Sequence, residues 1–214
     1  MLAPRQGGVL AVERNSARAL TMRCRCEQAC APVTVIESNF LHIDPSTEPF
    51  ARIELVLLDP SCSGSGMERH LENSEEGALS WGSWSKEVDS DADRTSLEEK
   101  AESLQGAQQP NRLHVLAAVQ LRLLLHALSF ASARRVSYST CSVHPIENEF
   151  VIAAAARDKA VRRAGWRLVP AMSRWPCGGL PIIDGMERCA RTCPEWLTNG
   201  FFVALFERDT PAAP

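Results

Sequence analysis

Residues 53–66 read IELVLLDPSCSGSG, an apolar run that passes directly into small and polar residues. A nearly continuous apolar run of this length is typical of a central parallel strand covered on both faces. Ligands of open α/β sheets bind beyond the carboxyl ends of such strands. Asp59 and Cys62, which follow the run, are therefore candidate functional residues.

A second cysteine follows a second predicted strand. Residues 135–140 are predicted as a strand, and they lead into Cys141 within the stretch YSTCS at 138–142. The stretch PIENE at 145–149 then opens a helix. Because both cysteines follow strand ends, both can face one crevice of the sheet. The alternative is that both are core cysteines.

Strand and helix patterns alternate along the chain. Strands are expected at 9–13, 33–37, 53–58, 135–140, near 166–168 and at 201–206, and helices at 16–29, 112–129 and 146–163. This alternation predicts an open α/β sheet. The 214 residues suffice for one domain with a sizeable core, which we expect to span residues 1–210.

Residues 67–110 interrupt the pattern and are rich in Ser, Glu, Asp and Gly, with 11 acidic and 4 basic side chains. A segment of this composition buries too little apolar surface to fold, so we predict an acidic insertion without a fixed structure. Trp81 and Trp84 are its main large apolar residues and form a candidate docking patch.

The remainder of the chain is mildly basic, with a net charge of +4 outside the insertion against −3 for the whole chain. Only three of the 23 basic residues are lysines. Arginine forks match phosphate oxygens and stack on bases, which suits an RNA partner, although solvated arginines are the simpler interpretation. The sequence contains neither an apolar run long enough for a transmembrane helix nor an apolar stretch typical of a secretory signal within residues 1–15.

The eight cysteines suggest a reducing compartment, in which most are expected to be buried as small apolar side chains. Cys24, Cys26 and Cys30 form one cluster, and Cys189 and Cys193 form another. Neither cluster has paired C-x2-C spacing, so we assign no metal site. A redox or metal-binding cysteine protein remains an open alternative at this point.

The combined motifs carry a more specific signal. The pattern D-x-x-C-S-G-x-G at 59–66, followed by Y-S-T-C-S at 138–142 and E-N-E at 147–149, resembles the NOL/NOP/Sun RNA cytosine-5 methyltransferases. The resemblance extends from Gly8 to Arg208, apart from the insertion. The forms at 33–40 (VTVIESNF) and 59–62 (DPSC) resemble the fifth Sun-domain subfamily, which methylates ribosomal RNA in the nucleus and its nucleolus.

The resemblance implies roles for three residues in the chemistry. Cys141 matches the nucleophile, Cys62 the second cysteine that helps to release methylated RNA, and Asp59 the carboxylate between cofactor and target base. The chain departs from the family pattern at Ser61, where the family usually has proline, and at Asn199, where it has aspartate.

The resemblance also implies a class I methyltransferase fold of the Rossmann-like type and S-adenosyl-L-methionine as cofactor. Glu13 matches the acid that binds the ribose hydroxyls, and Arg18 a basic contact one helical turn later. Asn39 stands near the adenine position, where the family usually has aspartate, and Asp59 also faces the cofactor.

A complete member of the family carries a first strand and a glycine-rich turn, similar to D-x-C-A-A-P-G-x-K-T, ahead of the position of Glu13. Residues 1–8 match only the tail of the helix that follows that turn, and no P-G-x-K occurs in this chain. We therefore expect a sheet that lacks its first strand, with an unpaired edge beside residues 9–13. A non-catalytic protein that keeps the sheet and binds RNA or a partner is the second interpretation.

Deletion of Glu72–Gln108 tests the predicted insertion. If this acidic segment has no fixed fold, its removal leaves the midpoint of thermal unfolding almost unchanged. Differential scanning calorimetry of the two forms measures the change. A large fall in the midpoint would show that the segment packs on the rest of the protein.

Overall fold

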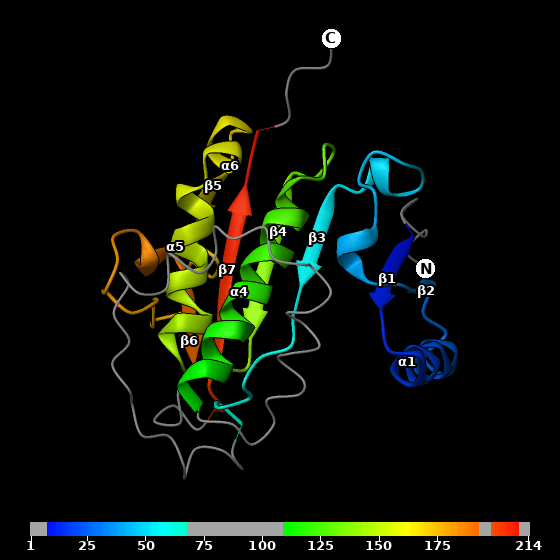
Figure 1. Cartoon of the computed structure of the whole chain (residues 1–214), viewed down its shortest axis with the longest axis horizontal. Coiled ribbons are helices and arrows are strands. Elements are labelled where there is room, and N and C mark those ends of the chain that lie inside the picture. The colour runs from blue at the N-terminus through cyan, green and yellow to red at the C-terminus, as the bar shows by residue number, and fades with distance from the viewer. Residues whose placement is uncertain (1–7, 68–108, 193–197, 210–214) are drawn as a thin grey trace. The chain divides into compact units, whose positions relative to one another are not determined.

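The computed structural model describes residues 8–67, 109–192 and 198–209 of the chain (Figure 1). Two compact units separate, Met1–Phe50 and Ala51–Pro214, and each is described by itself. The expected single domain over 1–210 therefore stays a prediction. Of the predicted insertion at 67–110, residues 68–108, with both tryptophans, lie outside the described residues, whereas Gln109 and Pro110 already belong to a helix.

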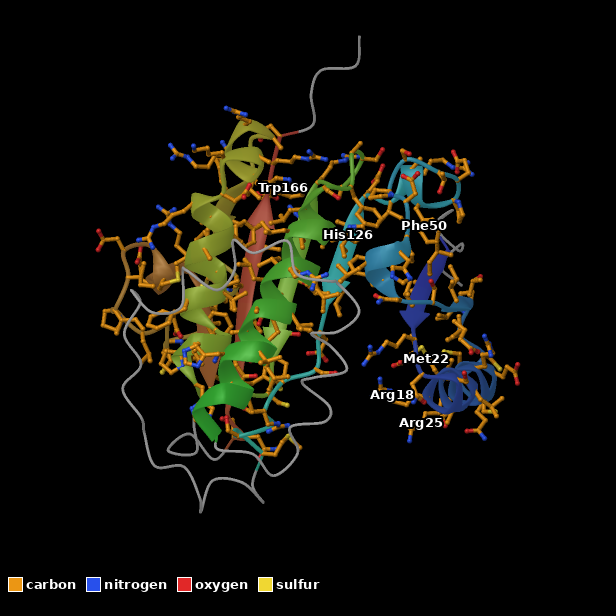
Figure 2. All side chains as sticks on the ribbon, in the orientation of Figure 1. Arg18, Met22, Arg25, Phe50, His126 and Trp166 are labelled. Carbon is orange, nitrogen blue, oxygen red and sulfur yellow. The ribbon has the colours of Figure 1, made fainter. Side chains whose placement is uncertain are left out.

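The first unit is a short β–α–β arrangement. Its elements are β1 (Val9–Glu13), α1 (Ser16–Gln28), β2 (Val33–Glu37) and the 3-10 turn η1 (Phe40–His42). The two strands pair in parallel with Glu13 opposite Glu37. Helix α1 begins where the Asn15 side chain accepts a hydrogen bond from the Arg18 N–H at 3.0 Å, an N-cap interaction. Figure 2 labels Arg18, Met22 and Arg25 along this helix.

The second unit is a mixed sheet of five strands with helices. Its elements are η2 (Phe50–Arg52, at the boundary of the units), β3 (Leu55–Leu58), α4 (Gln109–Leu128), β4 (Arg135–Thr140), η4 (Pro145–Glu147), α5 (Glu149–Arg157), α6 (Lys159–Arg163), β5 (Arg167–Val169), η5 (Met186–Arg188), β6 (Ala190–Thr192) and β7 (Phe201–Glu207). The strand order is β3-β4-β7-β5, and β6 also pairs with β7. β3 and β4 are parallel, whereas the pairs that include β7 are antiparallel.

Helices α4 and α5 lie over one face of this sheet (Figure 1). Alternate residues of β4 and β7 point into the resulting core, in agreement with the period of two along a strand. The fully buried members include Val136, Tyr138, Phe202, Ala204 and Phe206. Trp166, labelled in Figure 2, closes one end of the core and donates its indole N–H to the Leu128 carbonyl at 2.8 Å.

The structure corrects the interpretation of residues 53–58 as a central strand covered on both faces. Within the second unit, β3 pairs only with β4 among the described strands. Leu55 and Leu57, on the face away from α4, are 67% and 79% exposed. An apolar run therefore identified the strand but not its surroundings, because periodicity alone does not show what covers a face.

The predicted helix over 146–163 is divided into separate pieces. Asp158 breaks it, since its backbone leaves the helical conformation while its side chain accepts hydrogen bonds from the N–H groups of Ala160 and Val161. Short side chains of this kind favour N-caps over helix interiors because they compete for backbone donors. The predicted strand near 166–168 lies one residue later, at β5.

Each unit contains one sheet, β1-β2 in the first unit and the five-stranded sheet in the second. The unpaired edge expected beside residues 9–13 stays a prediction. No helix in the described part of the chain is both long and apolar enough to cross a membrane.

The cap at Asp158 gives a test of this local structure. Asp158→Ala removes the acceptor for two backbone N–H groups, which costs about 1 kcal/mol of unfolding free energy. Asp158→Asn keeps a capping oxygen and serves as the matched control with a smaller loss. Urea denaturation followed by circular dichroism measures both. Equal losses for the two variants would contradict the assigned cap.

Candidate active site

The two motif cysteines meet at one edge of the five-stranded sheet. β3 and β4 are parallel and in register, with Leu58 opposite Tyr138, so their carboxyl ends lie at the same edge. Cys141 follows β4 directly, and Cys62 lies four residues after β3. The Sγ atoms of Cys62 and Cys141 lie 3.2 Å apart, within hydrogen-bond distance of each other. The structure therefore brings the two sequence candidates together.

Backbone contacts bind the loop after β3 to the loop after β4. The Gly66 N–H donates to the Cys141 carbonyl at 2.9 Å, and the Gly200 N–H donates to the Gly66 carbonyl at 2.8 Å. Gly66 and Gly200 are both buried and touch through their backbones. A Cβ atom on Gly66 would overlap the Gly200 backbone, so this close approach requires glycine.

A buried polar cluster lies next to the loops that carry the two thiols. Glu147 and Ser142 are fully buried, and Ser65 nearly so. The Glu147 carboxylate accepts hydrogen bonds from the hydroxyls of Ser63 and Ser142, each at 2.6 Å. Ser63 adjoins Cys62 and Ser142 adjoins Cys141, so one carboxylate is bonded to the neighbours of both thiols.

The loop after β4 is fixed by further buried contacts. Asn148 donates its side-chain N–H to the Ser142 carbonyl at 2.8 Å and accepts the Thr140 hydroxyl at 2.6 Å. The Tyr138 hydroxyl donates to the Glu147 carbonyl. All these groups satisfy one another within the protein, as buried polar groups must if they are not to destabilise the fold.

An ion pair anchors the same loop from the other side. Arg191 on β6 binds the fully buried carboxylate of Glu149 through two hydrogen bonds of 2.7 Å. Its third nitrogen donates to the Val143 carbonyl at 3.1 Å, and its guanidinium lies over the Phe202 ring at 5.6 Å. This bidentate geometry holds the segment after Cys141 rigidly.

The two supporting carboxylates, Glu147 and Glu149, were visible in the sequence only as part of the E-N-E motif. Their contacts with Ser63, Ser142 and Arg191 join segments far apart in the chain. Local spacing therefore offered no signal for their roles, although the motif marked their positions.

The Cys62 thiol lies in an environment that disfavours its ionised form. Burial, the hydrogen bond to Cys141 and the charge of Glu147 together raise the pKa of Cys62 to about 12. The thiol therefore stays protonated at neutral pH and can donate a hydrogen bond to the Cys141 sulfur.

Asp59 lies at the end of β3, on the same strand edge as the thiols, but its side chain is exposed. It accepts a hydrogen bond from the Ser139 hydroxyl at 3.0 Å, which links the ends of β3 and β4.

The candidate cofactor residues Glu13, Arg18 and Asn39 all lie in the first unit. Glu13 ends β1, and its Oε1 accepts hydrogen bonds from the Asn15 N–H at 2.7 Å and the Arg18 guanidinium at 3.0 Å. Burial alone would raise the pKa of Glu13, but these two donors hold it below its ordinary value. The Asn39 side-chain oxygen accepts the Leu41 N–H at 3.0 Å and caps η1.

The remaining cysteines contradict the expectation that most are buried. Of the seven described as free, only Cys189 is buried, whereas Cys24 and Cys30 are exposed. Cys24 lies on α1, a helix whose only buried residue is Ala19, and Cys30 lies in the turn that follows this helix. Among the described residues, no group of three His, Cys, Asp or Glu side chains is arranged to hold a metal ion.

Comparison with known proteins supports the motif resemblance. No family model matches the sequence. Over 97% of its length, the chain is 36% identical to the 28S rRNA (cytosine-C(5))-methyltransferase of Mus musculus. Over 95% it is 34% identical to the 25S rRNA (cytosine-C(5))-methyltransferase NSUN5 of Arabidopsis thaliana. The chain is a relative of ribosomal RNA cytosine-C5 methyltransferases.

The resemblance predicted from the motifs, including the NSUN5 subfamily, is thus confirmed by sequence similarity. The chain spans 38% and 32% of the lengths of these two relatives. The activity of the full-length relatives is therefore a proposal for this chain.

Solved structures confirm the fold class. A methyltransferase homologue from Pyrococcus horikoshii matches 95% of this chain and 54% of its own with a TM-score of 0.64 at 21% identity. NSun6 from the same organism, crystallised with SFG, matches 94% of this chain and 41% of its own with a TM-score of 0.52 at 20% identity. The mixed α/β architecture agrees with a Rossmann-like methyltransferase fold.

Gly66→Ala tests the close approach of the site loops. The added Cβ overlaps the Gly200 backbone, which cannot move away as a flexible side chain would, so we expect a loss of about 1–3 kcal/mol in unfolding free energy. Gly8→Ala is the matched control, because nothing lies within 4 Å of its Cβ position. Chemical denaturation compares the two. A Gly66→Ala variant as stable as Gly8→Ala would contradict the packing described.

Proposed function

We propose that this chain carries the thiol-bearing part of a catalytic domain that methylates C5 of cytosine in RNA. The observation that carries the proposal is the pair of sulfur atoms, 3.2 Å apart, at the carboxyl ends of two adjacent parallel strands. The relatives' printed names support ribosomal RNA as the substrate class.

The chemistry explains why a thiol is needed. Cytosine C5 is too weak a nucleophile to take a methyl group unaided. We propose that the Cys141 thiolate adds to C6, which gives C5 the electron density to attack an electrophilic methyl group. A base then removes the C5 proton, the C5–C6 double bond forms again, and the sulfur of Cys141 leaves.

Cys62 and Asp59 take supporting roles in this proposal. The protonated Cys62 thiol is placed to donate a hydrogen bond to the Cys141 sulfur, which stabilises that sulfur as it leaves C6. Asp59 is exposed at the same edge and can hydrogen-bond the N3/N4 side of the base. The target base must be splayed out of its RNA to reach the thiol.

The first unit offers groups that fit S-adenosyl-L-methionine, which supplies the methyl group on a sulfonium when it is bound. An ionised Glu13 at a strand end suits two ribose hydroxyl donors, and its side chain is 17% exposed. Arg18 orients that carboxylate, and Asn39 follows the neighbouring strand β2. The SFG bound to NSun6 is an S-adenosylmethionine analogue, which also supports this cofactor.

RNA is the proposed partner, and the nucleus, with its nucleolus, the proposed location. The chain's basic residues are almost all arginines, which suit phosphate and base contacts. Ribosomal RNA as substrate implies the compartment in which that RNA is processed.

A second function keeps the same fold without turnover, as an RNA- or partner-binding protein. Isothermal titration of the chain with S-adenosyl-L-methionine separates the two functions. Tight binding would support methyl transfer and remove the second function from consideration, whereas no binding would favour the second function.

The roles of the two thiols are tested in a form of the protein that includes a glycine-rich cofactor loop. Cys141→Ala should abolish methyl transfer, because no other group adds to C6. Cys62→Ala should form the adduct but release it poorly, so that protein stays covalently bound to RNA. A denaturing gel with labelled RNA reports both outcomes.

The gel also shows which assignment fails. Accumulation of the adduct by Cys141→Ala, but not by Cys62→Ala, would reverse the two roles. Unchanged methylation by both variants would show that other groups carry out the reaction.

A further inference from the structure

Glu147 occupies a position that neither the motif roles nor the thiol chemistry explains. Its side chain is fully buried, yet its carboxylate is bonded to the neighbours of both thiols. Oε1 accepts the Ser63 N–H at 2.9 Å and the Gln120 side-chain N–H at 3.0 Å. Oε2 accepts the Ser63 and Ser142 hydroxyls at 2.6 Å.

Four donors satisfy this carboxylate, and none of them is a cation in the described part of the chain. A buried carboxylate needs hydrogen-bond donors that replace lost water, and these four groups supply them. Gln120 links this carboxylate to the loop of Cys62, because its N–H group faces Oε1 while it also donates to the Ser61 carbonyl at 3.0 Å. After burial and the hydrogen bond to Cys141, the charge of Glu147 is a further cause that raises the pKa of Cys62.

The other ionisable groups around Cys62 do not offset this charge. Cys141 lies against its sulfur, and both Cys62 and Asp59 interact electrostatically with the buried Tyr138. Arg191, a cation near the loop after β4, is bound by Glu149. The charge of Glu147 acts on the half-buried Cys62 from a fully buried position, where Coulomb interactions are stronger than in water.

We propose that Glu147 is a positioning residue that fixes Cys62 beside Cys141 and keeps the Cys62 thiol protonated. Its hydrogen bonds set the position of both loops, and its charge disfavours a thiolate at Cys62. Cys62 then serves as a hydrogen-bond donor to the sulfur of Cys141. The meaning of this arrangement rests on the proposed methyl transfer, but its test requires neither RNA nor cofactor.

The experiment measures the alkylation of each cysteine by iodoacetamide between about pH 7 and 10, with peptide mass spectrometry as readout. Only thiolates react at a useful rate, so the rate at Cys62 reports its ionised fraction. The full chain is compared with Glu147→Gln, which removes the charge, and Glu147→Asp, which keeps it. Glu54→Gln is the matched control, since it removes an exposed carboxylate paired with Arg134.

We expect Glu147→Gln to raise the alkylation rate of Cys62 about tenfold at fixed pH, because loss of the charge lowers the pKa of the Cys62 thiol. Glu147→Asp should stay within about threefold of the unmodified chain, because its carboxylate remains, and Glu54→Gln should change nothing. Cys189 is buried and reports folding, since it must stay unreactive in every variant.

Two results would overturn the inference in folded variants. One is an unchanged Cys62 rate in Glu147→Gln. The other is an equal increase in Glu147→Asp and Glu147→Gln, which would make the carboxylate a structural support whose charge is irrelevant. If Cys189 becomes reactive in Glu147→Gln, that variant is unfolded and the test uses the unmodified chain. The alkylation rate of its Cys62 should still be rising with pH at about pH 10. A rate that reaches a plateau below that pH would contradict the proposal.

Discussion

The parallel pairing of β3 with β4 is the constraint on which the rest of the site depends. Parallel strands in register end at one edge, and here the register places Leu58 opposite Tyr138. The loops that follow these two residues therefore begin side by side at this edge of the sheet. A shift of one residue would turn every side chain of the strand to the other face, so the full burial of Tyr138 favours this register.

Close packing and buried hydrogen bonds then fix the positions of the two loops that carry Cys62 and Cys141. Gly66 and Gly200 allow the backbones to touch, and Glu147 bonds to both loops from below. Burying a carboxylate costs free energy that four hydrogen bonds offset. Such a network is more demanding than apolar packing, because each buried polar group needs a hydrogen-bond partner in a fixed geometry. On the proposed function, this arrangement separates the roles of two chemically identical groups.

Much of this fold could be predicted from the sequence. The strands Val9–Glu13, Val33–Glu37 and Arg135–Thr140 lie where periodicity and β-branched residues placed them. The motif cysteines could be placed at strand ends because apolar runs stop directly before them. These features depend on neighbours in the chain, and local patterns report them well.

Features that depend on distant segments could not be predicted. The exposure of Leu55 and Leu57 reflects what covers the sheet, and the division of the helix at Asp158 reflects a choice between capping and continuing that helix. The bonds from Glu147 to Ser63 span 84 positions, so no local spacing reveals them. The cofactor candidates Glu13, Arg18 and Asn39 lie in a separate unit, and their roles rest on the family resemblance.

Mild oxidation of the unmodified chain tests the central claim, that folding places Cys62 against Cys141. Diamide oxidises two thiols to a disulfide where the sulfurs can approach to about 2 Å, and peptide mass spectrometry without reduction maps the product. The account predicts that Cys62 and Cys141 are joined to each other under native conditions, and that denaturation in urea before oxidation abolishes this preference. Failure to find the Cys62–Cys141 peptide in the native sample, with both cysteines free or joined elsewhere, would contradict it.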